Sequence, residues 1–228
     1  MIQKQSSNLT LIDKHDLRAG STSQLASHSF RIGHINIPSL RHKVHEVSSP
    51  ITQSSLSVLA VSESWLGCAD GNDFLAVDGY VLFRRDRSAT GQGGGVCIYV
   101  KEVFHASVEE QYSHADIELL WIRIRGTKHS HSFLIGCIYR PPASSVAFWP
   151  LLESTSEEAL GEEVVLLGDL HVDFLRPTEL CFSNTLTGLF SFHFVFVISS
   201  QHQHVLVGAF LHVSMSFSPT QIEFALVK

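Results

Sequence analysis

The chain has 228 residues, of which 44% are hydrophobic and 17% are charged, and this composition excludes intrinsic disorder for most of its length. The length suits one large domain and is too short for two ordinary domains and a linker. Sixteen Lys and Arg residues stand against twenty-two Asp and Glu residues, a formal net charge of −6. Any binding of phosphate must therefore be local, because a wide basic surface is excluded.

The first 29 residues are rich in Ser, Gln, Thr and Lys and show no hydrophobic periodicity. We expect residues 1–29 to form a disordered or loosely attached tail. This tail has no apolar segment typical of a signal peptide, and the chain has no uninterrupted apolar run of about 18 residues. These features predict an intracellular protein, nuclear or cytoplasmic, with no membrane partner. The sequence gives no indication of oligomerisation.

Structure is expected to begin near residue 30. The segment Phe30–Ile37 alternates well enough to be a strand, and the apolar residues of segment 40–47 have helical spacing. Ser57–Val61 is a continuous apolar run, which is typical of a strand buried on both faces. A carboxylate, Glu63, follows this strand directly.

The middle of the chain is predicted to be rich in hairpins. Its four expected strands are Tyr80–Phe83, Gly95–Val100, Ile117–Arg125 and Phe133–Tyr139. A helix is predicted next, with Ser144 or Ser145 as its cap and apolar residues from Phe148 to Leu160. A second buried strand, Val164–Leu167, then leads to Asp169.

The last part of the chain differs in composition, since only two charged residues occur after Thr185. Phenylalanines at every second position over 190–196 and a further apolar stretch over 205–217 predict strands that would aggregate if unpaired. We therefore divide the chain into the tail, a domain over 30–184, and divergent or degenerate strands over 185–228.

Three predicted strands end in groups that could share one site: Glu63, Tyr139 and Asp169. Rigid strands can aim such side chains into a common cleft, and Mg²⁺ prefers carboxylate, phosphate and water oxygens. The alternative is that each acid only caps a loop, because Asp after Gly at a strand end is ordinary turn chemistry. Spacing alone favours this alternative.

Six short motifs occur in a characteristic order. They are HINIPSL from His34, SESWL from Ser62, DGY from Asp78 with FRRDR from Phe83, GGGVCIYV from Gly93, IYRPP from Ile138 and GDLH from Gly168. Together they resemble the endonuclease/exonuclease/phosphatase superfamily, specifically the apurinic-endonuclease-like domain of LINE-type non-LTR retrotransposons. The resemblance covers residues 30–176. It implies an α+β fold, the four-layer αββα sandwich of DNase I-like proteins, here incomplete at the C-terminus.

The resemblance also implies a single Mg²⁺-dependent phosphodiesterase site that acts on DNA. Asn36 matches an Asn beside the metal and the phosphate, and Glu63 matches the metal-binding Glu. Tyr139 matches a Tyr that donates a hydrogen bond to the scissile phosphate, and Asp169 matches the Asp that orients and deprotonates the attacking water. The basic residues that fit contacts to DNA are Arg84, Arg85, Arg87 and Arg140. The first three fit a solvated hairpin loop equally well.

Two departures from the family pattern concern the chemistry. The family has Gly-Asp-Phe-Asn where this chain has Gly-Asp-Leu-His, so His171 replaces a catalytic amide. The family also closes with an Asp-His pair, whereas this sequence has no Asp after Asp173. The chain therefore resembles a truncated or decayed copy, and we expect weak or no activity.

Alternative functions remain compatible with the sequence. A non-catalytic relic or a binding module for protein or nucleic acid would keep the same fold, and a phosphatase of the same superfamily fits the motifs less well.

The pairs His129/His131 and His202/His204 lack further ligands at zinc-site spacing and are interpreted as surface residues. The Gly91–Gly95 run opens a strand, which favours a hairpin turn over a phosphate loop. The four cysteines lack a C-x-x-C motif and are expected to be buried free thiols.

Overall fold

The computed structural model describes residues 30–87, 93–125, 132–159 and 163–171, together with the backbone of 194–198 and 222–226. The expected tail and the apolar stretch over 205–217 lie outside the described residues. So do both His-x-His pairs and Cys181.

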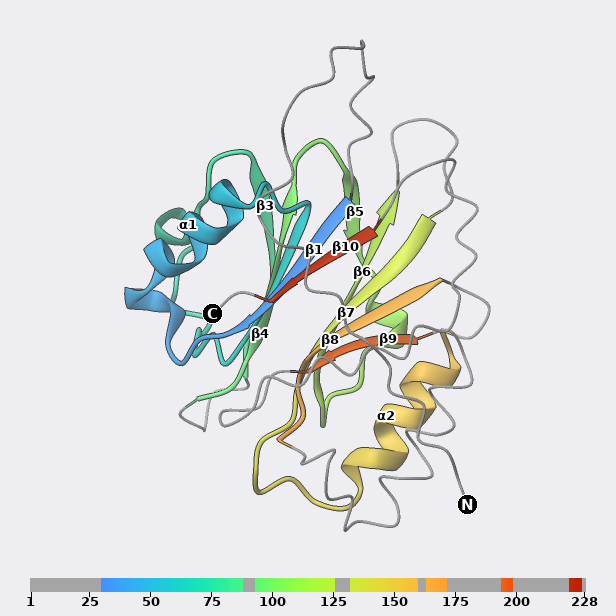
Figure 1. Ribbon diagram of the computed structural model, residues 1–228. Helices are drawn as coiled ribbons and strands as arrows, with labels where there is room; N and C mark the ends of the chain where they lie inside the picture. Colours follow the sequence, from blue (N-terminus) through green and yellow to red (C-terminus); the bar gives the residue numbers. More distant parts are fainter. Residues whose placement is uncertain are drawn as a thin grey trace, which may run out of the picture.

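Five strands form the first sheet, in the order β10-β1-β2-β4-β3 (Figure 1). Their bounds are Phe30–Asn36 for β1, Val58–Ser62 for β2, Tyr80–Arg85 for β3, Val96–Lys101 for β4 and Ile222–Leu226 for β10. β1 runs parallel to both β2 and β10, while β4 is antiparallel to β2 and β3. β3 and β4 pair as a hairpin, as predicted, while residues 88–92 of their connection lie outside the described residues.

The second sheet has the order β5-β6-β7-β8-β9. Its strands are β5 (His105–Val108), β6 (Glu118–Arg125), β7 (Ser132–Tyr139), β8 (Val164–Asp169) and β9 (Phe194–Ile198). β8 is parallel to β7 and to β9, whereas β5, β6 and β7 are antiparallel. Each sheet therefore contains parallel strands whose carboxyl ends point the same way.

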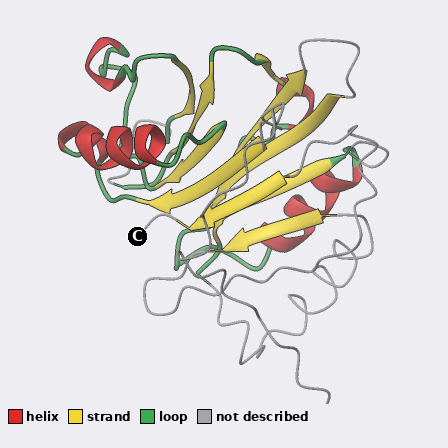
Figure 2. Cartoon of the chain, turned by 45° about the horizontal axis from the view of Figure 1, so that its top comes forward, coloured by secondary structure: helices red, strands yellow, loops and turns green. Residues whose placement is uncertain are grey.

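The two sheets pack face to face, and one helix covers the outer face of each (Figures 1 and 2). α1 (Val44–Gln53) packs on the first sheet through Val47 and Ile51, and α2 (Phe148–Glu157) packs on the second through Phe148 and Leu152. A third apolar cluster, which includes Ile98 and Val165, fills the space between the sheets. The expected αββα sandwich is thus confirmed.

Short 3₁₀ turns connect several of these elements. They are η1 (Leu40–His42), η2 (Asp73–Leu75) and η3 (Glu110–Tyr112). The predicted cap of α2 is wrong, because the helix begins after Ala147 and its cap makes no side-chain hydrogen bond. Ser145 contributes only its backbone carbonyl, which accepts a hydrogen bond from the Phe148 amide.

Strands β9 and β10 come from the segment after residue 184, and each joins a different sheet. The prediction that residues 190–196 contribute to a strand is therefore confirmed for the part that β9 includes. Among the described cysteines, Cys97 and Cys137 are buried and free, while Cys68 is free but exposed. None of the described helices is both long and apolar enough to cross a membrane.

Candidate active site at the carboxyl ends of the parallel strands

The carboxyl ends of two parallel strand pairs, β1 with β2 and β7 with β8, bring polar side chains together between the sheets. Asn36 is the last residue of β1 and pairs with Ser62, the last residue of β2. In the other sheet Tyr139 and Asp169 are direct neighbours at the ends of β7 and β8. The apolar strand interiors fix these positions because they are buried on both faces.

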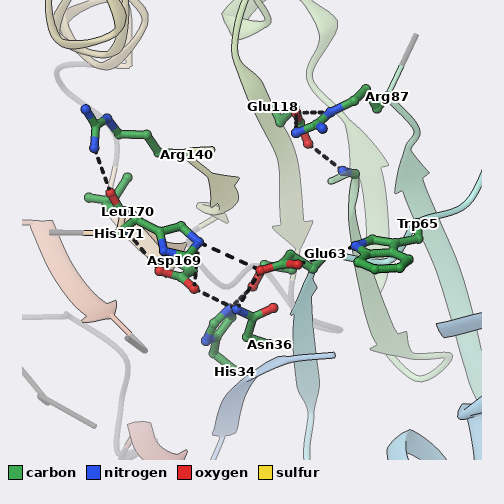
Figure 3. A network of polar contacts seen from close by, with 12 residues as sticks. His34, Asn36, Glu63, Trp65, Arg87, Glu118, Arg140, Asp169, Leu170 and His171 are labelled. Carbon is green, nitrogen blue, oxygen red and sulfur yellow. Dashed lines mark hydrogen bonds and ion pairs between the residues drawn. The ribbon is translucent and has the colours of Figure 1, made fainter. Parts of the chain in front are cut away.

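Asn36 joins the two acids of the site across the sheets (Figure 3). Its Nδ2 donates hydrogen bonds to Glu63 Oε1 at 3.2 Å and to Asp169 Oδ2 at 2.6 Å. Both carboxylates are buried, and Asp169 has no exposed surface. The structure therefore brings the two carboxylates and the amide into direct contact. Two acids that each only capped a loop would not need to meet in this way.

His171 completes the group. Its Nε2 lies 3.8 Å from Glu63 Oε1 and 3.6 Å from Asp169 Oδ2, while its backbone N–H donates to Asp169 Oδ1 at 3.0 Å. The imidazole packs edge to face on Tyr139, with ring centroids 5.6 Å apart. All the predicted site residues of the strand ends, namely Asn36, Glu63, Tyr139, Asp169 and His171, thus converge.

The backbone at this site adopts unusual conformations. Among the described residues, Glu63, Trp65 and His171 have φ values of 59°, 54° and 46°, in the left-handed region that costs an ordinary residue about 1–2 kcal/mol. Strain of this kind persists only where the surrounding structure imposes it, and it is concentrated at functional sites.

Burial affects the protonation of Tyr139 and Asp169, which are neighbours at the ends of β7 and β8. It raises the pKa of Asp169, and the negative charge of Glu63 raises it further, whereas the backbone N–H and imidazole of His171 and the amide of Asn36 oppose the rise. Burial also raises the pKa of Tyr139, with the charge of Glu63 as the next cause. Tyr139 is therefore a phenol, and hence a hydrogen-bond donor, at neutral pH.

Glu118 holds a neighbouring arginine and the glycine segment in place (Figure 3). Its carboxylate accepts a hydrogen bond from Arg87 Nε at 2.6 Å and another from the Gly95 backbone N–H. The Arg87 guanidinium lies 5.9 Å from the centre of the Tyr139 ring. Sequence reasoning missed Glu118, because only the pairing of Glu118 with Tyr139 in β6 and β7 reveals that it lies beside the site.

Trp65 lies at the rim of the site and was also not assigned a role from sequence. Its indole N–H donates to Glu63 Oε2 at 3.4 Å, and 44% of the residue is exposed. A Cβ on Gly93 would come within 3.3 Å of Trp65 Nε1, so the indole lies directly against the glycine segment. The only sequence signal was its position two residues after Glu63.

The arginines expected to contact DNA differ in their surroundings. Arg84 is fully engaged within the protein, through Asp86, Asn72 and the carbonyls of residues 67 and 70. Arg85 donates to the His114 carbonyl, and Arg87 is the Glu118 partner. Arg140 is 6% exposed, with its guanidinium over the rings of Phe148 and Trp149 and a hydrogen bond to the Leu170 carbonyl. A DNA contact stays a prediction for these residues, and the burial of Arg140 gives it no support there.

The donor set fits a divalent metal ion. Ligand atoms of Glu63, Asp169 and His171 lie within 4.8 Å of one another. Asn36 Oδ1 and His171 Nε2 are buried without a hydrogen-bond partner in the described part of the chain. Buried polar atoms are nearly always satisfied in native proteins, so two such atoms without partners beside two carboxylates are consistent with a cation site.

The fold is that of DNase I-like proteins, and comparison of structures agrees. No known family profile matches the sequence, and no curated protein matches it. The endonuclease domain of TRAS1, a telomere-specific non-LTR retrotransposon, superimposes with a TM-score of 0.54 at 8% identity, over 69% of this chain and 70% of that domain. This likeness shows that the chain has the endonuclease/exonuclease/phosphatase fold.

Two further similar structures are nucleases. AP endonuclease LMAP from Leishmania major has a TM-score of 0.49 and 16% identity, over 61% of this chain and 54% of that one. The Xenopus laevis APE2 catalytic domain has a TM-score of 0.48 and 18% identity, over 67% of this chain and 63% of that one. The match thus covers from about half to seven-tenths of the three structures.

Proposed function

We propose that this chain is a metal-dependent phosphodiesterase that nicks DNA, derived from a retrotransposon endonuclease and slow in its present form. The observation that carries the proposal is the convergence of Glu63, Asp169 and His171 beside Asn36 and Tyr139. The names of the structurally similar nucleases support the choice of nucleic acid as substrate.

The metal would be held by Glu63, with Asn36, Asp169 and His171 as the other groups within reach. The family resemblance favours Mg²⁺. A bound divalent cation would supply charge stabilisation for the pentacoordinate phosphate and would orient the phosphodiester.

Asp169 is suited to take the proton from the attacking water. Burial and the charge of Glu63 raise its pKa, and a base with a raised pKa removes a proton more effectively at neutral pH. The hydrogen bonds from Asn36 and from the His171 backbone hold both of its oxygens in fixed positions. Tyr139, as a buried phenol, would donate to an oxygen of the phosphate as negative charge develops there.

The rate should be low, because two groups differ from the family pattern. His171 replaces an amide, and the 228 residues contain no Asp after Asp173 to orient a second imidazole. Loss of one acid-base or oxyanion group costs about 10²- to 10⁴-fold in rate, and such losses are not additive.

The test is nicking of supercoiled plasmid by the full chain with Mg²⁺, with Asp169→Ala as the inactivated variant. Asp116→Ala is the matched control, since the Asp116 side chain is 77% exposed on a loop. We expect weak nicking by the wild type and by Asp116→Ala, and less by Asp169→Ala. Equal rates for all three proteins would overturn the proposal.

The alternative function is a non-catalytic module that binds nucleic acid with the same fold. The absence of an Asp after Asp173 is the observation that favours it. Plasmid binding by gel shift, without nicking by any of the three proteins, would support this alternative. A rate typical of active family members from the unmodified chain would instead contradict the proposed loss of activity.

A further inference from the structure

We propose that the site binds Mn²⁺ in preference to Mg²⁺, with the imidazole nitrogen of His171 as a metal ligand beside the carboxylates of Glu63 and Asp169. The inference rests on the metal site of the proposed function, but it does not depend on catalysis. Its origin is the residue type at position 171, where the motif of the resembling family has an amide.

The separation of the donor atoms is that of ligands rather than of hydrogen-bonded groups. His171 Nε2 lies 3.8 Å from Glu63 Oε1 and 3.6 Å from Asp169 Oδ2, which is beyond a hydrogen bond. Two atoms bound to one ion by bonds of about 2.1 Å can be up to about 4.2 Å apart. Both separations fall within that limit.

The ring nitrogen Nε2 of His171 is also buried and forms no hydrogen bond with the described residues. The side chain as a whole is 16% exposed. Nε2 faces the carboxylates of both Glu63 and Asp169. A cation between the three groups would accept the lone pair of this nitrogen and compensate the charge of the two carboxylates.

The surrounding structure holds the imidazole in this position. The His171 backbone N–H donates to Asp169 Oδ1, and the ring lies edge to face against Tyr139 at an interplanar angle of 77°. The backbone has a φ of 46°, a conformation in which His and Asn occur more often than most residues. The position is thus preorganised for a ligand, and it can accept Asn without backbone rearrangement.

The mixed donor set decides the preference between the two ions. Mg²⁺ is bound through oxygen ligands and keeps several waters. Mn²⁺ is a first-row transition ion and accepts an imidazole nitrogen more readily than Mg²⁺ does, while it shares the affinity of Mg²⁺ for the carboxylate and phosphate oxygens that the proposed reaction requires. An Asn in place of His171 would offer an amide oxygen instead, and the advantage of Mn²⁺ would shrink.

The experiment measures metal binding to the full chain without DNA. The electron paramagnetic resonance signal of free Mn²⁺ gives its affinity, and titration with Mg²⁺ gives the ratio of the two affinities. We expect Mn²⁺ to bind about tenfold more tightly than Mg²⁺ or better, and His171→Asn to reduce this ratio at least about tenfold, as loss of a group that supports a metal does. Electron spin echo modulation should show a nitrogen coupled to Mn²⁺ in the wild type and not in His171→Asn.

His45→Asn is the matched control, because His45 is an exposed residue of α1 and its loss should leave affinity and nitrogen coupling unchanged. Glu63→Gln should weaken the binding of both ions. Equal affinity for both ions without nitrogen coupling would overturn this inference and leave the proposed function standing. Failure of both ions to bind the wild type would overturn the metal site, and the proposed function with it.

Discussion

Gly168 on β8 pairs with Ile138 on β7, one residue before the proposed base. A Cβ at this position would lie 1.9 Å from the Ile138 carbonyl oxygen and 2.7 Å from the Ile138 side chain. No side chain can be accommodated without moving the strands apart. The glycine therefore permits the observed pairing of β8 with β7 directly before Asp169.

Gly168→Ala should destabilise the protein severely. Overpacking against side chains costs about 1–3 kcal/mol, and the obstacle here is a backbone carbonyl, so we expect about 3 kcal/mol or more. Urea denaturation followed by circular dichroism measures the change. Gly71→Ala is the control, because a Cβ there meets no atom within 4 Å, and an equal loss in both variants would contradict the explanation.

His34 lies on the strand that carries Asn36, and its burial should make the stability of the protein depend on pH. It is 1% exposed, its Nε2 lies 3.1 Å from Ser62 Oγ, and its Nδ1 has no partner in the described part of the chain. Burial lowers its pKa from 6.5 to about 3. The folded protein therefore keeps this imidazole neutral while the unfolded chain takes up a proton below pH 6.5.

The sign of this effect is fixed, since the state that binds the proton is favoured as the pH falls. The free energy of unfolding should fall by about 0.7 kcal/mol per pH unit at pH 6.5 and by a slope that approaches about 1.4 kcal/mol per pH unit near pH 5, because of His34. His34→Leu should remove this part of the dependence, whereas His45→Leu should not. Urea denaturation of the three proteins at several pH values measures the slopes, and identical slopes would show that His34 is not responsible.

At the scale of elements, the connection between β3 and β4 is tied to the second sheet by one carboxylate. Gly93, Gly94 and Gly95 have φ values of 84°, 74° and 79°, so this segment needs glycine to reach β4 in its observed path. Glu118 on β6 accepts hydrogen bonds from Gly95 and from Arg87, and these contacts join the hairpin to the sheet that carries Tyr139.

Glu118→Gln should loosen this connection. A lost hydrogen bond to a charged group costs about 1.5–3 kcal/mol, and the effect should be local, with faster hydrogen exchange at the Gly95 amide. Glu109→Gln is the matched control, because Glu109 forms a similarly buried pair with Arg123 that does not contact the Gly95 amide. Hydrogen exchange at Gly95 that rises equally in both variants would contradict a specific role for Glu118.

Elements with strong hydrophobic patterns could be predicted from sequence, and elements defined by long-range contacts could not. The buried runs of β2, β4, β7 and β8 were evident because both faces of these strands are covered. The short strand β5 was not predicted, since none of its four residues is buried. The caps and 3₁₀ turns depend on backbone geometry that the residue types did not indicate.

The site residues also divide into those that the sequence indicated and those that only long-range contacts reveal. Glu63, Tyr139 and Asp169 could be grouped because each lies at the end of a predicted strand, although spacing alone favoured loop caps. Asn36 joined this group only through the family resemblance. Glu118 carries no such signal. The family resemblance led us to expect a DNA contact for Arg140, whereas its burial against Phe148 and Trp149 is visible only in three dimensions.

At the scale of the whole molecule, the site depends on both sheets and on the end of the chain. Asn36 and Glu63 belong to one sheet and Asp169 to the other, so their contacts exist only when the sheets are packed. β10 covers the edge of β1 along five paired positions, Phe30 to His34. Without it, β1 would present an unpaired edge.

Deletion of residues 219–228 should therefore destabilise the first sheet and favour association between chains. We expect a loss of about 2 kcal/mol, or about 4–8 °C in Tm for a protein of this size, with association that depends on concentration. Deletion of residues 1–29 is the control, and the tail hypothesis predicts no change in Tm. Thermal denaturation with light scattering tests both, and a larger effect from the N-terminal deletion would contradict that division of the chain.

The three tryptophans give the molecule an optical probe of its own site. Trp121 and Trp149 are 0% and 1% exposed, whereas Trp65 is 44% exposed and donates its indole N–H to Glu63. Iodide should therefore quench emission from Trp65 alone, and a red-shifted component should belong to the same residue. An ion that draws the Glu63 carboxylate toward itself would alter this hydrogen bond, so occupancy of the site can be followed by fluorescence in the unlabelled protein.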